Sequence, residues 1–327
     1  MELIRGQHNL RPWHRGCVAT IGNFDGVHLG HRVILDQLTR QMARLRLPRM
    51  VITFEPQPQE FFAGPTAPPA RLMRLREKLL ALDGLGIERV LCLKFDHQLA
   101  AMPASDFINE LLVNRLGIRY LVVGDDFRFG HRRAGDFAML VAAGQRHGFE
   151  VVDTHSYILD DQRVSSTRTR EALAHGDLEA AARLLGRPYD MCGRVAHGDQ
   201  IGRTIGFPTA NIHLLRRVTP VYGVYAVVMS GAGLQPWPGV ANVGRRPTVR
   251  GIRQQLEVHL LDFRGDLYGQ QVKVDFMHYI RPEQRFESLM ALQAQIQRDT
   301  HTARSYFSAR GIVIPDTHHR PLLPEAF

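Results

Sequence analysis

The stretch Gly-Asn-Phe-Asp-Gly-Val-His-Leu-Gly-His, residues 22–31, decides the fold of the first part of the chain. A short apolar run at residues 17–22 precedes it, and apolar residues at helical spacing follow it over residues 31–46. In open α/β sheets, ligands bind beyond the carboxyl ends of the strands, where such a turn lies. Because a helix N-terminus offers free N–H groups and a partial positive charge, this turn predicts a phosphate site.

Two histidines, His28 and His31, lie three residues apart in this turn. Their imidazoles can donate hydrogen bonds and carry charge near neutral pH, although isolated histidines more often only cap helices. The stretch matches neither the P-loop pattern nor the dinucleotide-binding pattern, so neither of those sites is indicated.

The rest of the first half alternates predicted strands and helices. Strands are expected at residues 50–54, 89–95, 120–124 and 150–153, and helices at residues 74–83, 104–116 and 134–147. This alternation predicts βαβ units and a doubly wound parallel sheet. Two further segments fall at the ligand-binding edge of that sheet, GDDFRFG at residues 124–130 and RVSSTRTR at residues 163–170. The second is either a helix cap or, with its arginines, a grip for a triphosphate.

The pattern changes after about residue 186, where Leu-Gly-Arg-Pro ends a helix. Residues 256–260 and 272–276 alternate apolar and polar side chains, as strands with one buried and one solvent-exposed face do. Such strands without intervening helices predict an antiparallel barrel or sandwich, and residues 286–307 predict a closing helix. We therefore expect two domains, residues 1–186 and 187–327.

Composition narrows the class of protein. The chain has 327 residues, and its 41 basic against 32 acidic residues give a net charge of +9 without long like-charge blocks. We expect anionic small molecules as partners and no nucleic acid. Three separated cysteines argue against a disulfide framework and a zinc ribbon. No membrane-spanning stretch or signal-peptide core is visible, so a soluble cytoplasmic protein without a membrane partner is expected, of unknown oligomeric state.

Taken together, these motifs resemble the bacterial bifunctional riboflavin kinase/FMN adenylyltransferases, also called FAD synthetases. The resemblance rests on residues 22–31, Thr-Phe-Glu-Pro at 53–56, residues 124–130 and Val-Ser-Ser-Thr at 164–167. It implies that the first domain transfers AMP from ATP to FMN, giving FAD and pyrophosphate, and that His28 and His31 contact the ATP phosphates. The other implied nucleotide-site residues are Gly22, Asn23, Gly30, Asp126, Arg163, Ser166 and Thr167.

Two positions depart from the family pattern. Gln57 stands where the family usually has histidine, and Thr169 where it usually has an aliphatic residue. Gln57 can still donate a hydrogen bond through its amide.

The second domain opens with a Gly-rich loop that ends in Pro-Thr-Ala-Asn. Thr209 and Asn211 alternate, so on an extended segment they point the same way. Hydroxyl and amide oxygens are ligands that Mg²⁺ accepts beside phosphates and water, but an ordinary polar turn explains the same residues. The family resemblance implies a six-stranded flavokinase barrel that phosphorylates riboflavin with ATP and Mg²⁺, with Thr209 and Asn211 at the metal. The loop residues implied at the nucleotide are Gly198, Gly202, Arg203 and Gly206.

The two reactions make different chemical demands. The attacking FMN phosphate is already ionised at neutral pH, so positioning and charge stabilisation suffice for adenylyl transfer. The ribityl hydroxyl of riboflavin is neutral, and a carboxylate that accepts its proton is useful. The resemblance implies that Glu257 is this base and that Arg281 belongs to a flavin-covering loop. Alternation predicts that Glu257 faces away from the apolar side of its strand, although most glutamates are simply solvated.

Two other hypotheses remain at this point. In the first, the N-terminal domain is an adenylyltransferase for another phosphate acceptor, such as phosphopantetheine or glycerol phosphate, and the barrel is an accessory. Alternatively, the chain is a flavin-responsive nucleic-acid-binding regulator, which the net charge of +9 suggests.

Overall fold

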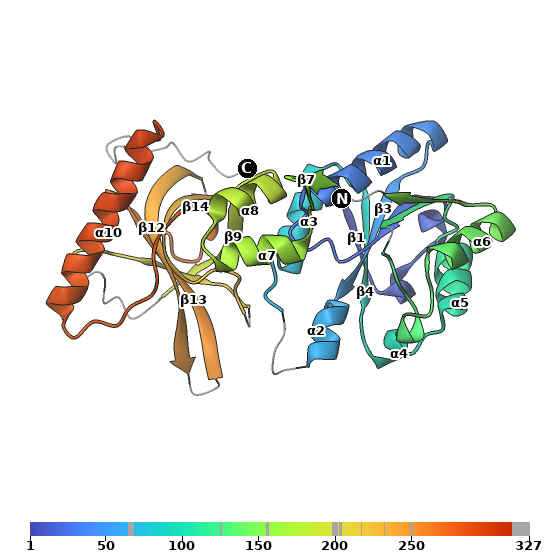
Figure 1. Ribbon diagram of the computed structural model, residues 1–327, viewed down its shortest axis with the longest axis horizontal. Coiled ribbons are helices and arrows are strands. Elements are labelled where there is room, and N and C mark those ends of the chain that lie inside the picture. Colours follow the sequence, from blue (N-terminus) through green and yellow to red (C-terminus); the bar gives the residue numbers. More distant parts are fainter. Residues whose placement is uncertain are drawn as a thin grey trace. The chain divides into compact units, whose positions relative to one another are not determined.

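The computed structural model describes residues 1–64, 69–124, 126–154, 157–197, 202, 205–216, 218–231, 233–248 and 251–315. The chain divides into two compact units (Figure 1). The first comprises Met1–Pro69 and Met73–Ser166, and the second Ala70–Leu72 and Thr167–Phe327. None of the helices in these described ranges is long and apolar enough to cross a membrane.

The first unit is built on a six-stranded sheet in the order β1-β4-β3-β2-β5-β6, and all neighbouring strands are parallel. The strands are β1 (Glu2–Arg5), β2 (Val18–Ile21), β3 (Arg49–Glu55), β4 (Arg89–Lys94), β5 (Tyr120–Gly124) and β6 (Glu150–Thr154). Every residue of β2 is buried, because a central parallel strand is covered on both faces.

Helices cover both faces of this sheet, which confirms the doubly wound prediction. The helices α1 (Leu29–Leu45) and α3 (Leu75–Gly84) pack on one face, with Leu38 and Leu82 in their core. The π-helix η3 (Phe107–Arg115) and α6 (Phe137–His147) pack on the other. The shorter elements are η1 (Gln7–Asn9), η2 (Pro12–His14), α2 (Pro58–Ala63), α4 (His97–Ala100), α5 (Ala104–Asp106), η4 (His131–Arg133), β7 (Ile158–Leu159) and β8 (Gln162–Arg163).

Sequence periodicity did not predict strand β1. It spans four residues at the edge of the sheet, and only Ile4 is buried. So short a strand carries too few alternating positions to be recognised.

The second unit contains a closed barrel in the order β10-β13-β12-β11-β14-β9, with antiparallel neighbours throughout. The strands are β9 (Tyr189–Ala196), β10 (Ala210–His213), β11 (Gly223–Gly231), β12 (Leu234–Thr248), β13 (Gly251–Leu260) and β14 (Gln271–Arg281). Side chains such as Tyr225, Val258 and Phe276 fill the interior. The predicted six-stranded barrel is confirmed.

The closing helix α10 (Leu289–Ala309) lies against the outer wall of the barrel. Its buried Ala303 and Phe307 pack on Val224, Ala226 and Val240. Strand β11 is consequently buried on both faces, since Tyr225 and Val227 point inward. The predicted helix is confirmed, and it begins a few residues later than expected, after the cap Ser288.

Two helices before the barrel share its core. In α7 (Ser166–Ala174) and α8 (Leu178–Leu185), Leu173, Leu178 and Leu185 join the cluster that contains Tyr189. The segment Ala70–Leu72 is held in the same unit by hydrogen bonds: Arg170 Nε donates to the Ala70 carbonyl at 2.6 Å, and Arg216 Nη1 to that of Arg71 at 2.9 Å. The expected domain boundary after residue 186 stays a prediction, which this packing makes testable.

We expect a fragment of residues 167–327 to melt at a higher temperature than one of residues 187–327. The shorter fragment lacks the three leucines of α7 and α8 that belong to the barrel's core cluster, and each buried leucine contributes about 1.5–3 kcal/mol. Thermal unfolding of both fragments, followed by circular dichroism, measures the difference. Equal melting temperatures would show that the barrel does not need these helices and would favour the boundary after residue 186.

Candidate active sites

The turn between β2 and α1 has an unusual backbone. Phe24 and Val27 adopt positive φ angles of 48° and 43°, which non-glycine residues rarely hold without surrounding support. That support includes Asp25, whose Oδ1 accepts from the Met73 amide at 2.9 Å, and Ser166, whose hydroxyl donates to the Asp25 carbonyl at 2.8 Å. The predicted phosphate turn is therefore a fixed structure, with Ser166 next to it.

His28 caps helix α1 through its ring. Its Nδ1 accepts from the His31 amide at 3.3 Å, so the proton of a neutral ring lies on Nε2, which remains a donor. The two imidazoles are stacked, with centroids 3.6 Å apart and planes 15° apart. A Cβ on Gly30 would lie 3.3 Å from the His28 ring, so glycine lets the helix begin this close to it. The structure brings both predicted histidines together.

Burial, followed by the nearby His28 and Lys78, holds the pKa of His31 well below its usual value. Lys78 on α3 is 1 % exposed, and its Nζ donates to Thr53 Oγ1 at 3.3 Å. The site thus combines a neutral His31 with a buried cation. Sequence reasoning missed Lys78; the only signal for it is a lysine on the apolar face of a predicted helix.

Several other predicted residues of the first site make contacts within the first unit. The Gly22 amide donates to the Ile52 carbonyl at 3.0 Å, and Thr53 Oγ1 to the Asn23 carbonyl at 3.4 Å. Arg163 pairs with Asp126 at 3.2 Å, and both side chains are substantially exposed. Ser166 ends the first unit, whereas Thr167 belongs to the second.

Gln57, the departure from the family pattern, is a buried residue at the carboxyl end of β3. It is 1 % exposed, and within the described ranges its Nε2 has no hydrogen-bond partner. A buried donor without a partner is a candidate for ligand contact, because leaving it unpaired is costly. Thr169, the other departure, is fully buried within α7.

An aromatic cavity of about 470 Å³ lies beyond the carboxyl ends of β3, β4 and β5. Its apolar wall includes Leu99 and Met102, and three arginines, Arg128, Arg132 and Arg133, also line it. The aromatic residues in the wall are Phe54, Phe62, Phe95, Phe107, Phe127 and Phe129. In the sequence, these phenylalanines carry no signal beyond their aromatic character.

In the second unit, a cavity of about 410 Å³ contains the predicted kinase residues. It lies outside the barrel interior, between the strands β10, β12 and β13 and the helix α10. Gly202, Thr209, Asn211, Glu257 and Arg281 all line it. Gly206 has a φ of 84° in the preceding turn, which favours glycine. Gly198 and Arg203 lie outside the described residues.

Glu257 is flanked by an asparagine on each neighbouring strand. It pairs with Asn211 of β10 and with Asn242 of β12, and all three line the cavity. Gln255 Nε2 donates to Glu257 Oε1 at 2.7 Å and to Asn211 Oδ1 at 2.9 Å. Leu256 and Val258 are buried in the barrel, so the predicted alternation around Glu257 is confirmed. The amide network orients the carboxylate toward the cavity.

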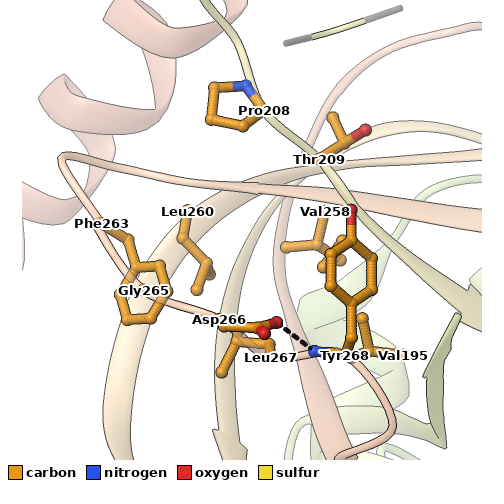
Figure 2. A pocket seen from close by; sticks show the side chains of 11 residues that line it. Val195, Pro208, Thr209, Val258, Leu260, Phe263, Gly265, Asp266, Leu267 and Tyr268 are labelled. Carbon is orange, nitrogen blue, oxygen red and sulfur yellow. Dashed lines mark hydrogen bonds between the residues drawn. The ribbon is translucent and has the colours of Figure 1, made fainter. Parts of the chain in front are cut away.

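A neighbouring cavity of about 380 Å³ shares Thr209 with the cavity that contains Glu257 (Figure 2). Its wall is largely apolar, with Leu260, Phe263 and Tyr268, and Asp266 accepts from the Tyr268 amide at 2.9 Å. In Figure 2 the Tyr268 ring extends toward Thr209. The ring of His197 stacks on Tyr268 with centroids 3.9 Å apart. Two cavities therefore meet at the Pro-Thr-Ala-Asn segment.

The chemistry of the donors bears on a bound metal. Within the described ranges no group of three or more His, Cys, Asp or Glu side chains is placed to hold an ion. Thr209 and Asn211 offer a hydroxyl and an amide oxygen, which fit Mg²⁺ when phosphates and water supply its other ligands.

Comparison with known proteins places both halves in one family. The family described as FAD synthetase matches residues 10–168, and the family described as riboflavin kinase matches residues 185–307. The bifunctional riboflavin kinase/FMN adenylyltransferase of Escherichia coli is 56% identical over 308 residues, 94% of this chain and 98% of that one. The Haemophilus influenzae protein of the same name is 52% identical, covering 94% and 100% of the two chains.

A solved structure shares the fold. It is titled a macrolide-efflux protein from Streptococcus pneumoniae, is 29% identical, and covers 93% of this chain and 99% of its own with a TM-score of 0.79.

The lowered pKa of His31 predicts a loss of stability in acid. Unfolded His31 takes up a proton below about pH 6.5 while folded His31 stays neutral, so the unfolded state gains up to about 1.4 kcal/mol per pH unit below that value. Imidazole nitrogen shifts in an NMR titration should show protonation of His31 near pH 6.5 in urea, and a His31 that stays neutral well below that pH in the folded protein. Protonation of folded His31 near pH 6.5 would contradict its assigned environment.

Proposed function

Because the chain belongs to the bifunctional riboflavin kinase/FMN adenylyltransferase family, we propose which of its residues carry each reaction. The C-terminal half phosphorylates riboflavin to FMN with ATP, and the N-terminal half transfers AMP from ATP to FMN, giving FAD and pyrophosphate. The proposal rests on one observation above all, the row Asn211–Glu257–Asn242 across three strands of the kinase cavity.

In the kinase reaction, Glu257 accepts the proton of the terminal ribityl hydroxyl. The hydroxyl oxygen then attacks the γ-phosphorus of ATP, the bond from that phosphorus to the bridging oxygen breaks, and ADP leaves. Gln255 and the flanking Asn211 keep the carboxylate in place through the amide network. A positioned base of this kind contributes roughly 10²–10⁴-fold to the rate.

The two kinase substrates occupy the two cavities that meet at Thr209. Riboflavin takes the cavity that contains Glu257, because the base must reach its hydroxyl. ATP takes the neighbouring cavity, whose apolar wall with Phe263 and Tyr268 suits a purine. Thr209 and Asn211 would hold the Mg²⁺ that accompanies ATP, and the ion would neutralise charge on the phosphates.

In the adenylyl transfer, the turn at residues 22–31 holds the ATP phosphates. His28 donates from Nε2, Ser166 offers its hydroxyl, and Arg163 supplies charge. An ionised FMN phosphate oxygen attacks the α-phosphorus, and the bond to pyrophosphate breaks. Gly22, Asn23, Gly30, His31, Asp126 and Thr167 complete the proposed nucleotide site.

The aromatic cavity of the first unit is the proposed site for the flavin ring of FMN. Its volume of about 470 Å³ and its phenylalanine wall suit a flat aromatic ligand. The three arginines in its lining favour the FMN phosphate over neutral riboflavin.

We further propose a cytoplasmic enzyme. None of the three cysteines, Cys17, Cys92 and Cys192, is in a disulfide, as expected in a reducing compartment. The absence of a nucleic-acid partner stays a prediction, which salt-dependent retention on DNA or RNA tests.

Paired variants test the assignment of the two sites. Glu257→Gln should slow FMN formation by roughly 10²–10⁴-fold, because a neutral amide cannot take the proton. It should leave FAD formation from supplied FMN unchanged. His28→Ala should slow FAD formation from supplied FMN and leave FMN formation from riboflavin unchanged. Chromatography of riboflavin, FMN and FAD over time measures both steps.

Each variant serves as the folding control for the other. If either substitution removed both activities from a folded protein, the assignment to separate sites would fail. If the wild-type protein left riboflavin unchanged, the proposed kinase function itself would fail.

A cavity-filling variant tests the FMN site. Leu99→Trp should raise KM for FMN in adenylyl transfer by about tenfold or more, since overpacking the wall costs about 1–3 kcal/mol. Leu80→Trp is the matched control, because Leu80 lies in the same unit and is 56 % exposed. Steady-state rates at varied FMN give both values. An unchanged KM in Leu99→Trp would place FMN elsewhere.

A further inference from the structure

A buried carboxylate that sequence reasoning did not identify lies in the kinase cavity. Asp299 on α10 is 3 % exposed and lines the cavity together with Glu257. Its two oxygens accept three hydrogen bonds from Arg281: Nε donates to Oδ1 at 2.9 Å and to Oδ2 at 3.0 Å, and Nη2 donates to Oδ2 at 2.8 Å. The pair is a bidentate ion pair that joins the end of β14 to α10.

The carboxylate of Asp299 is itself oriented from its own helix. Gln295 Nε2 donates to Asp299 Oδ1 at 2.8 Å. The amide oxygen of Gln295 accepts from Arg298, with Nη2 at 2.6 Å and Nε at 3.0 Å. Arg298 therefore sets the amide orientation of Gln295, and Gln295 sets the position of Asp299.

These contacts leave the Arg281 guanidinium little freedom. Its Nη1 donates to the Pro282 carbonyl at 2.9 Å, and its Cζ lies 5.7 Å from the Phe286 ring centroid. Within the part of the chain that the structure describes, these hydrogen bonds leave one N–H of Nη1 and one of Nη2 for a ligand. The guanidinium is thus fixed in the cavity wall, with donors remaining.

Stability alone is a weak explanation for this pair. Burying two charges is costly, and apolar residues of similar size often replace a buried ion pair without loss of stability. The ion pair fixes the direction of the guanidinium, which apolar residues cannot do.

We propose that Asp299 is a positioning residue of the kinase reaction, which holds Arg281 in the orientation that binds the flavin ring of riboflavin. The proposal rests on the proposed function of the Glu257 cavity. Arg281 touches the substrate, and Asp299 acts through Arg281. Placing the flavin ring in this way sets the ribityl hydroxyl against Glu257.

The test is a double-mutant cycle on the full-length protein. Asp299→Asn and Arg281→Lys are each expected to raise KM for riboflavin by about tenfold, with a smaller change in kcat and none in KM for ATP. Because both changes act through one contact, the double variant should show about the effect of one single variant. FAD formation from supplied FMN should remain at the wild-type rate.

Asp262→Asn is the matched control. It breaks the ion pair of Asp262 with Arg304, which also joins the barrel to α10 at 2.7 Å but does not line the cavity. This variant should keep the wild-type KM for riboflavin. If Asp299→Asn also kept that KM, or if the two changes were additive in the double variant, the positioning role would be overturned.

A second pair of variants covers the case in which Asp299→Asn fails to fold. Arg281→Met with Asp299→Leu replaces the ion pair by apolar side chains. It should fold, form FAD from FMN, and show the riboflavin KM of Arg281→Met alone. A wild-type KM in this double variant would show that the pair only joins the helix to the barrel. Inactivity of the wild-type kinase would instead overturn the proposed function.

Discussion

The kinase half depends on the alternation of side chains along β13. Leu256 and Val258 are locked into the barrel interior, so the intervening Glu257 is forced onto the outer wall. A shift of one residue in register would bury the carboxylate among Tyr225 and Phe276, at a cost of several kcal/mol. The apolar core therefore fixes the proposed base more firmly than any single polar contact does. The helix α10 then closes a cavity over that base.

In the adenylyl-transfer half, the start of helix α1 likewise fixes the orientation of a side chain, that of His28. His28 cannot turn freely, because its Nδ1 caps α1 and its ring is stacked on His31. The cap leaves Nε2 as the donor, and Gly30 permits the close approach. The positive φ angles of Phe24 and Val27 show that packing holds the turn in a conformation the isolated chain would avoid. In both halves, the side chains proposed to contact substrate are oriented by the backbone beneath them.

Sequence patterns predicted the fold and the clusters better than the individual contacts. Glycine-framed histidines and the alternation around Glu257 are local in sequence, and the structure brings the predicted kinase residues Thr209, Asn211 and Arg281 to one cavity. Asp299 and Lys78 were missed, because each is an ordinary charged residue of a helix whose importance arises from partners far away in the chain. The aromatic cavity was also missed, since phenylalanines usually mark the core.

The charges of the two cavities proposed for the flavin favour riboflavin in one and FMN in the other. FMN carries a phosphate dianion that riboflavin lacks. The kinase cavity contains the carboxylates of Glu257 and Asp299, and Asp299 is already paired with Arg281, so the new phosphate meets Glu257 as a like charge. The aromatic cavity instead has Arg128, Arg132 and Arg133 in its lining. On the proposed assignment, phosphorylation thus weakens the binding of the flavin to the kinase cavity and strengthens its binding to the aromatic cavity.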